Sequence, residues 1–224
     1  MACAIQNNYL QTYGNVQPVG LKFINNPVNC NIYHNNINIT GNNAANGTAM
    51  EIENATNLNI KNNILANQTE GYTLKINSST ASFIADKNCF FTYGDNLFKW
   101  NNQNIQKLNQ WVATTGQDAN SKNINPFFVS DTNLKMNQIQ LNNNADYVGV
   151  DIDIDSTSRI SNNDIGAKVF NPCVNDAGID SVVGMLHNLT NTTMNIKGIL
   201  QNHGTATLTN VKIYYSVNGV VQPV

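Results

Sequence analysis

The architecture of this chain follows from one phrase, Cys30-Asn31-Ile32-Tyr33-His34-Asn35-Asn36-Ile37, in which apolar residues alternate and an Asn marks a corner. Three further copies begin at Cys3, Leu58 and Phe83, and each has an Asn five residues after its first position. The successive offsets are 27, 28 and 25 residues. A period of this size is typical of stacked supersecondary units that bury their apolar faces only against their neighbours. The sequence therefore predicts a solenoid.

A second alternating segment precedes the later copies, as in Leu21-Lys22-Phe23, Met50-Glu51-Ile52 and Leu74-Lys75-Ile76. Alternation with a period of two predicts strands. We therefore expect each coil to contain two short strands around an Asn corner, with parallel sheets between coils. The middle residues of these segments, together with Lys99, are expected to form a solvated ladder of charges. The positions expected to face the core are Leu21, Phe23, Ile32, Ile37, Met50, Ile52, Leu58, Ile60, Leu65, Leu74, Ile76, Phe83 and Phe90.

The composition argues against two classes of function. The chain has 224 residues, a formal net charge of −2 and 12% charged residues. With Arg159 as its single arginine, it lacks the basic footprint of a nucleic-acid-binding protein. It also lacks a run of eighteen apolar residues, so we expect no membrane insertion.

Asparagine is unusually abundant, at 44 of the 224 residues. Asn tolerates the left-handed backbone conformation better than most residues, and its side chain can mimic a backbone turn. In stacked strands, Asn amides can also align into hydrogen-bonded ladders. We therefore expect Asn turns and ladders here rather than disorder.

Four cysteines, at positions 3, 30, 89 and 173, lack the close pairing of a zinc site. Cys3 and Cys30 occupy the same position of the repeat, so adjacent coils would place their Cα atoms about 4.8 Å apart. A disulfide can bridge that distance. Inward-facing cysteines also serve as small apolar side chains, and the sequence leaves both alternatives open.

The rhythm changes after Phe91. Residues 104–114 carry apolar side chains at helical spacing, which predicts a short helix that interrupts the solenoid and stops at Gly116. Within this helix Trp111 is expected to cap the solenoid core rather than to offer a sugar-stacking surface. Strands are expected to resume near three apolar segments, at 127–129, 134–139 and 148–154.

Four phrases carry a family resemblance, namely Asp86-Lys87-Asn88-Cys89-Phe90-Phe91, residues 108–121, Asn125-Pro126-Phe127-Phe128-Val129 and Asp164-Ile165-Gly166-Ala167. They resemble the closing portion of right-handed parallel β-helix proteins of the pectate-lyase-like superfamily, in the form found in secreted Bacteroidetes surface proteins. Lys168 follows the last phrase where the family usually has Glu, and Ser156 stands where Gly is common. The resemblance implies an all-β fold with a right-handed parallel β-helix over residues 1–170 and an extracellular or cell-surface location.

The remaining residues follow a different pattern. After a linker at 171–175, residues 176–224 alternate as in antiparallel strands and contain the hairpin signal Asn218-Gly219. They resemble the first half of an immunoglobulin-like adhesion module of the CARDB type, through Asp176-Ala177-Gly178-Ile179 and residues 202–205. Such a sandwich needs about 100 residues. We therefore expect a partial immunoglobulin-like β-sandwich, and a chain that is a fragment of a larger secreted or cell-surface protein.

One candidate site lies on the coil surface. His34, next to Tyr33, is predicted to align with Gln6, Lys61 and Asp86 of the neighbouring coils, and together these residues are expected to form a shallow carbohydrate-binding face. The alternative is an ordinary polar coil surface, since no apolar pocket is implied.

A second candidate site lies near the end of the solenoid. Asp151, Asp153 and Asp155 alternate, which would place three carboxylates on one face of a strand. Calcium could neutralise them, or Arg159 could pair with some of them as a capping feature.

We assign no catalytic residue, because the sequence shows neither an acid cluster with a dedicated base nor a nucleophile with a His partner. Calcium is the one cofactor considered. Our first hypothesis is a non-catalytic structural, adhesion or carbohydrate-binding scaffold whose partner is a polysaccharide or a cell-surface glycan. The alternative is the C-terminal part of a polysaccharide lyase or glycoside hydrolase whose catalytic coils precede Met1.

Overall fold

The computed structural model describes residues 3–41, 47–77, 82–161, 163–183, 197–217 and 219–222. The chain divides into two units, Met1–Asn171 and Pro172–Val224, which we describe separately. The strands of the first unit stack into a parallel β-solenoid, as the repeated phrase predicts.

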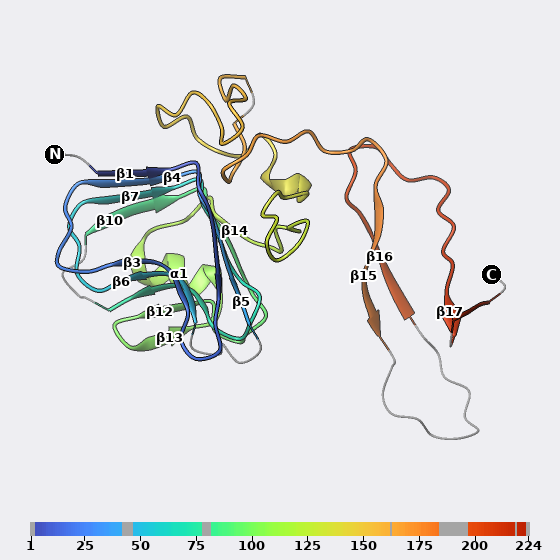
Figure 1. Cartoon of the computed structure of the whole chain (residues 1–224), viewed down its shortest axis with the longest axis horizontal. Coiled ribbons are helices and arrows are strands. Elements are labelled where there is room, and N and C mark those ends of the chain that lie inside the picture. The colour runs from blue at the N-terminus through green and yellow to red at the C-terminus, as the bar shows by residue number, and fades with distance from the viewer. Residues whose placement is uncertain are drawn as a thin grey trace. The chain divides into compact units, whose positions relative to one another are not determined.

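Three sheets run through the solenoid (Figure 1). The first sheet contains β1 (Cys3–Gln6), β4 (Cys30–Tyr33), β7 (Leu58–Lys61) and β10 (Phe83–Asp86). The second contains β2 (Tyr9–Tyr13), β5 (Asn36–Thr40), β8 (Ile64–Asn67), β11 (Cys89–Thr92) and β14 (Lys122–Asn123). The third contains β3 (Val19–Phe23), β6 (Thr48–Ile52), β9 (Tyr72–Ile76), β12 (Phe98–Trp100) and β13 (Gln103–Ile105). Neighbouring strands are parallel except for β12 and β13, which pair antiparallel.

Each complete coil therefore has three strands, and the prediction of two was wrong. The repeated phrase does not lie in one sheet, because its chain bends between β4 and β5. His34 has a φ of 53° at this bend, which turns the chain from the first sheet into the second. The predicted register is nevertheless confirmed, since Ile32 pairs with Ile60, and Cys3 pairs with Cys30.

The core is formed by the positions expected to face inward. All of them are buried except Leu21 and Phe83, which are partly buried and pack against the same cluster. Each position meets its equivalent in the next coil, so the alternating pattern becomes continuous columns of apolar side chains along the solenoid. These columns bury the apolar face that a single coil would leave exposed.

Turns account for part of the abundance of Asn. Fourteen described non-glycine residues have positive φ, and nine of them are Asn. Asn57 and Asn62, with φ of 60° and 61°, adjoin the two ends of β7. Because Asn adopts this conformation with less strain than most residues, the prediction of Asn turns is confirmed.

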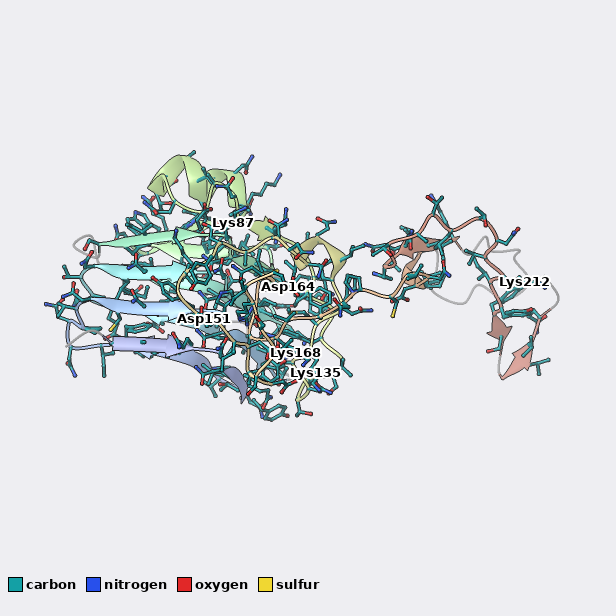
Figure 2. All side chains as sticks on the ribbon, turned by 90° about the horizontal axis from the view of Figure 1, so that it is seen from above. Lys87, Lys135, Asp151, Asp164, Lys168 and Lys212 are labelled. Carbon is teal, nitrogen blue, oxygen red and sulfur yellow. The ribbon has the colours of Figure 1, made fainter. Side chains whose placement is uncertain are left out.

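The predicted helix is α1 (Leu108–Thr115), which ends at Gly116 in a left-handed conformation. Its one buried residue is Trp111, which belongs to the solenoid core cluster and confirms the predicted cap. Figure 2 shows the coils stacked in order, with the segment that carries α1 beyond the last of them. In the part of the chain that the structure describes, no helix is long and apolar enough to cross a membrane.

Residues 124–161 and 163–170 form an extended segment, which we call the arm, and it covers the outer face of the second sheet. Ile64 and Cys89 of that sheet form a second apolar cluster with three residues of the arm, Met136, Leu141 and Ile165. Figures 1 and 2 show the arm beside the stacked strands, and Figure 2 labels Asp151 and Asp164 on it.

The strands predicted within the arm, at 127–129, 134–139 and 148–154, are absent. The arm contains a 3-10 helix, η1 (Ile139–Leu141), and two isolated bridges, Phe128↔Met136 and Ile152↔Ser158. The reason is that its backbone bonds to side chains on the sheet face rather than to a sheet edge. The carbonyl of Leu134, for example, accepts a hydrogen bond from the Asn36 amide at 2.7 Å.

The second unit contains two antiparallel strand pairs. β15 (Ala177–Val183) pairs with β16 (Lys197–Asn202), and β17 (Ser216–Val217) pairs with β18 (Val220–Val221). The latter pair flanks the predicted turn at 218–219, although Asn218 itself lies outside the described residues. Apolar side chains of this unit are exposed, among them Val182, Ile199, Leu200, Ile213, Val220 and Val221.

Candidate functional site

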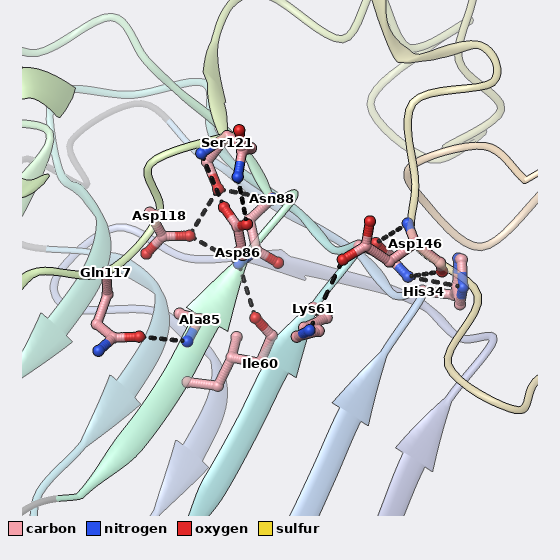
Figure 3. Close-up of polar contacts among 12 residues, drawn as sticks. His34, Ile60, Lys61, Ala85, Asp86, Asn88, Gln117, Asp118, Ser121 and Asp146 are labelled. Carbon is pink, nitrogen blue, oxygen red and sulfur yellow. Dashed lines mark hydrogen bonds and ion pairs between the residues drawn. The ribbon is translucent and has the colours of Figure 1, made fainter.

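Three of the four predicted carbohydrate-binding residues share one register position at the ends of β4, β7 and β10. Tyr33 pairs with Lys61, and Lys61 pairs with Asp86. His34 is one residue further along, at the turn, so its predicted alignment with Gln6, Lys61 and Asp86 was wrong. The structure thus brings Tyr33, Lys61 and Asp86 into a row and leaves His34 outside it. Figure 3 shows Lys61 and Asp86 of this row together with His34.

Two members of this row are bound to other parts of the protein. Lys61 Nζ lies 3.7 Å from Asp146 Oδ2 of the arm. Asp86 accepts two hydrogen bonds of 2.8 Å from Asn120, one from the backbone N–H and one from the side-chain amide. Tyr33 is half-buried. Any glycan on this row would therefore compete with the segments that close the solenoid.

His34 is fully buried under the arm rather than on the surface. Its Nδ1 lies 3.2 Å from the Gly166 carbonyl, and its Nε2 lies 3.1 Å from the Asn62 amide nitrogen. Since a carbonyl only accepts and an Asn Nδ2 only donates, the ring carries its proton on Nδ1. Burial, followed by the nearby Arg159 charge, lowers the pKa of His34 to about 3. The neutral imidazole thus links the arm to the coils through hydrogen bonds (Figure 3).

The Asn of each repeated phrase forms the amide ladder expected from the sequence. Asn8 Nδ2 donates to Asn35 Oδ1 at 2.8 Å, Asn35 to Asn63 at 3.0 Å, and Asn63 to Asn88 at 3.1 Å. All three bonds point in the same direction along the solenoid. Amide dipoles aligned in this way reinforce one another in a buried chain of hydrogen bonds. The ladder therefore stabilises the core and fixes the register of each coil against the next.

The ladder ends on a carboxylate, Asp118, whose role the sequence analysis missed. Its Oδ1 accepts from the Asn88 amide at 2.9 Å and from the Ser121 hydroxyl at 2.6 Å, and its Oδ2 accepts from Trp111 Nε1 at 2.9 Å. Burial raises the pKa of Asp118, whereas these donors oppose the rise. An acceptor-only group suits this place, because the last amide in the ladder needs an acceptor and no further copy of the repeated phrase supplies one.

The predicted charge ladder is present but is not fully solvated. Glu51 is 6% exposed and lies 3.1 Å from Lys75 Nζ and 3.9 Å from Lys22 Nζ. Lys22 also lies 2.6 Å from Glu53, and the Asn77 amide donates to Glu51. A buried carboxylate with several partners serves the stability of the coils and leaves little capacity for a ligand.

The three carboxylates considered for calcium do not converge. Asp153 is buried and accepts backbone N–H groups of Asp155, Thr157 and Val169, while Asp151 accepts from the Tyr147 hydroxyl. The prediction that they share one face of a strand was wrong, because the chain turns from Ile154 onward. Nowhere in the described ranges do three or more His, Cys, Asp or Glu side chains gather as a metal site would require.

Asp155 contacts Lys168 instead of its acidic neighbours. Arg159, the other expected partner, is fully buried and donates to backbone carbonyls, with Nη2 2.9 Å from Gly166 O and Nη1 3.3 Å from Asp164 O. Its Nη2 also contacts Asn7 Oδ1 at 3.2 Å. Arg159 therefore binds the arm to the first coil rather than pairing directly with the three carboxylates.

Gly166 is the point at which these arm contacts meet. It has a φ of 106°, and a Cβ placed there would lie 2.6 Å from Asn36 Oδ1 and 2.8 Å from Ile64 Cδ1. Its N–H donates to the Asn62 carbonyl at 2.8 Å. This explains in physical terms why Gly occupies that place in the phrase Asp164-Ile165-Gly166-Ala167.

We expect Gly166→Ala to lower the free energy of unfolding by about 2–3 kcal/mol, since it combines backbone strain with a clash in a packed interface. Gly149→Ala is the matched control. Gly149 also lies on the arm and has a φ of 79°, but nothing lies within 4 Å of its added Cβ. Urea unfolding followed by circular dichroism would measure both variants. Equal losses for the two would contradict a role of close packing at Gly166.

The Cys3 and Cys30 thiols are free and lie on paired positions of β1 and β4. Burial and then a hydrogen bond with the Cys3 thiol raise the pKa of Cys30 to about 11. We expect added oxidised glutathione to accept the two electrons and two protons released when these thiols form a disulfide. The closed loop would stabilise the protein by about 3–4 kcal/mol.

Intact mass and unfolding midpoint would test this in a Cys173→Ser background, which removes the other exposed thiol. Formation of the disulfide should remove two hydrogen atoms and raise the midpoint, and Cys3→Ser should abolish both effects. Persistence of two free thiols after prolonged exposure to the oxidant would show that the pair serves only as small apolar side chains.

Comparisons with known proteins found no match for this chain among family models, curated proteins or solved structures.

Proposed function

We propose that this chain is a non-catalytic scaffold of a secreted or cell-surface protein, which serves adhesion or glycan binding rather than turnover. The observation that carries the proposal is how the repeated polar side chains are used. The residues that recur from coil to coil, such as Asn35 and Asn63, donate and accept within the solenoid. Because the polar side chains of the repeat hydrogen-bond to one another, they stiffen the solenoid, and this favours a scaffold role.

The acidic residues support the same reading. Glycoside hydrolysis needs two carboxyl groups that flank the scissile bond, one of which must deliver a proton. Asp86, Asp118 and Asp164 each accept at least two hydrogen bonds from neighbouring protein groups. These bonds fix the carboxylates in structural roles. The finer assignments, a right-handed helix of the pectate-lyase-like superfamily followed by part of an immunoglobulin-like module, form part of the proposal and rest on the resemblance described above.

The proposal is tested by offering the purified chain a panel of polysaccharides and analysing the products. We expect retention on some immobilised glycans without new reducing ends or unsaturated sugars. Sustained turnover of any polysaccharide would overturn the proposal and favour the lyase or hydrolase alternative. A longer chain that contains this one should be assayed in parallel, because the alternative places catalysis in preceding coils.

A further inference from the structure

A polar hollow lies on the solenoid where two successive coils pass from the second sheet to the third. It is formed by the loop between β8 and β9 and the loop between β11 and β12. Its volume is about 290 Å³, and it is lined by Glu70, Tyr93, Gly94, Asp95 and Asn96. The hollow is distinct from the row of Tyr33, Lys61 and Asp86, which lies at the end of the first sheet.

The hollow contains the two acidic side chains that the coils do not use. Residues 3–105 include five acids. Glu51 and Glu53 pair with lysines, and Asp86 is held by Asn120. Glu70 and Asp95 have no hydrogen bond or ion pair with any residue that the structure describes, and both are exposed. Their acceptor oxygens are therefore available to a ligand.

The loops that form the hollow are held in place by close backbone contacts. A Cβ added at Gly94 would lie 2.3 Å from the Glu70 carbonyl oxygen, so the loops can approach this closely only with Gly at that position. The Thr92 hydroxyl accepts from the Gly94 N–H at 3.0 Å and donates to the Gly71 carbonyl at 2.7 Å. A site preformed in this way loses little conformational entropy when a ligand binds.

Tyr93 provides an apolar surface beside these acceptors. Its side chain is 64% exposed, and its ring packs edge-on against Phe91, with 5.0 Å between ring centroids. A sugar ring has an apolar C–H face and hydroxyl groups around its edge. An exposed aromatic ring can contact the face, while carboxylate and amide groups accept and donate at the edge. These residue types at one hollow match that chemistry.

We propose that this hollow binds a neutral sugar residue of a polysaccharide, with Tyr93 against the ring face and Glu70 and Asp95 accepting from its hydroxyl groups. The inference rests on the proposed function, for which it names a ligand class and a place. Two unpaired carboxylates would repel a uronate, so acidic polysaccharides are disfavoured. The volume is close to the lower end for small-molecule sites, which suits one or two sugar rings.

The test measures binding of defined oligosaccharides to the full chain by isothermal titration calorimetry. The probes are cellohexaose, mannohexaose and xylohexaose as neutral chains and hexagalacturonate as the acidic chain. We expect at least one neutral probe to bind and hexagalacturonate not to bind. Tyr93→Ala should lower the affinity for the neutral probe about tenfold, which corresponds to about 1.4 kcal/mol of binding free energy. Asp95→Asn should also lower this affinity, because Asn replaces one acceptor oxygen with a donor.

Matched controls are available on the same fold. Tyr13→Ala removes a tyrosine that is 62% exposed on β2, and Asp131→Asn removes an exposed acid of the arm. Both should bind like the parent chain, and thermal melting would confirm that all four variants are folded. Equal binding by the Tyr93 and Asp95 variants and the parent would overturn the inference.

The outcomes separate this inference from the proposed function. If neutral probes bind but depend on Tyr33 or Lys61 rather than Tyr93, the hollow is excluded and the scaffold function stands. If a probe is cleaved, the scaffold function fails whatever the site. Preference for hexagalacturonate, loss of binding in a chelator, or no binding of any neutral probe would overturn the inference at the hollow.

Discussion

Asn63→Ala is expected to lower the free energy of unfolding by about 3–5 kcal/mol, because Asn63 is the central step of the buried amide ladder. Its Nδ2 donates to Asn88 Oδ1, to the Ile32 carbonyl at 2.8 Å and to the Lys61 carbonyl at 3.0 Å. Its Oδ1 accepts from the backbone and side-chain nitrogens of Asn35. Alanine would leave several buried groups without partners, and each such group costs about 1–3 kcal/mol.

The matched control for this prediction is Asn59→Ala. Asn59 lies on the same strand, β7, is half-buried, and donates one side-chain bond to Asn31. Its loss is expected to cost about 1 kcal/mol or less, since water can replace that bond. Denaturant unfolding monitored by circular dichroism would measure both variants. Similar losses at the two positions would show that the buried ladder contributes no more than a surface Asn pair.

Trp111→Ala is expected to cost about 3–5 kcal/mol, the range typical of removing a buried tryptophan. The ring of Trp111 stacks on Phe98 with 4.6 Å between centroids and lies near Phe83 and Trp100. Its Nε1 donates to Asp118 at 2.9 Å. The substitution would open a cavity over the last coil and remove one donor from a buried carboxylate.

Trp111→Phe separates these two effects. Phenylalanine retains part of the stacking but has no N–H for Asp118. Trp111→Phe should therefore lower the free energy of unfolding measurably, but less than Trp111→Ala does. Asp118→Asn should also lower the stability, because its amide N–H groups would face the donors that now bind the carboxylate, among them Trp111 Nε1. The measurement is the unfolding free energy of the three variants. Full stability of Trp111→Ala would show that α1 is an attachment rather than the cap of the core.

Much of the solenoid could be predicted because its determinants are local and repeated. Inward positions such as Ile32 and Ile60 alternate along the chain, and the constant spacing of the copies sets which residues pair. The ladder at Asn35, Asn63 and Asn88 followed from the same spacing. By contrast, the bend that makes three strands per coil depends on positive φ at His34 and at the equivalent residues Asn7, Asn62 and Lys87. A pattern of apolar residues does not predict this backbone conformation.

The candidate site was predicted less well, because it depends on which outward faces are covered. Asn36 and Asn38 alternate like solvent-facing residues but are fully buried under the arm. Lys61 and Asp86 were correctly aligned, yet their partners Asp146 and Asn120 lie 85 and 34 residues further along the chain. No local pattern distinguishes a polar side chain that meets water from one that meets a distant segment.

The repeated phrase was therefore sufficient to establish a stack of coils, the inward positions and the column of asparagines, because these depend on short-range alternation and a constant offset. The folded chain was needed to show that the arm covers the second sheet, that Asp118 ends the ladder and that His34 is buried and neutral. It also showed that Glu70 and Asp95 lack partners in the described structure. The physical reason is that burial and pairing of an outward side chain depend on contacts with residues far away in the sequence.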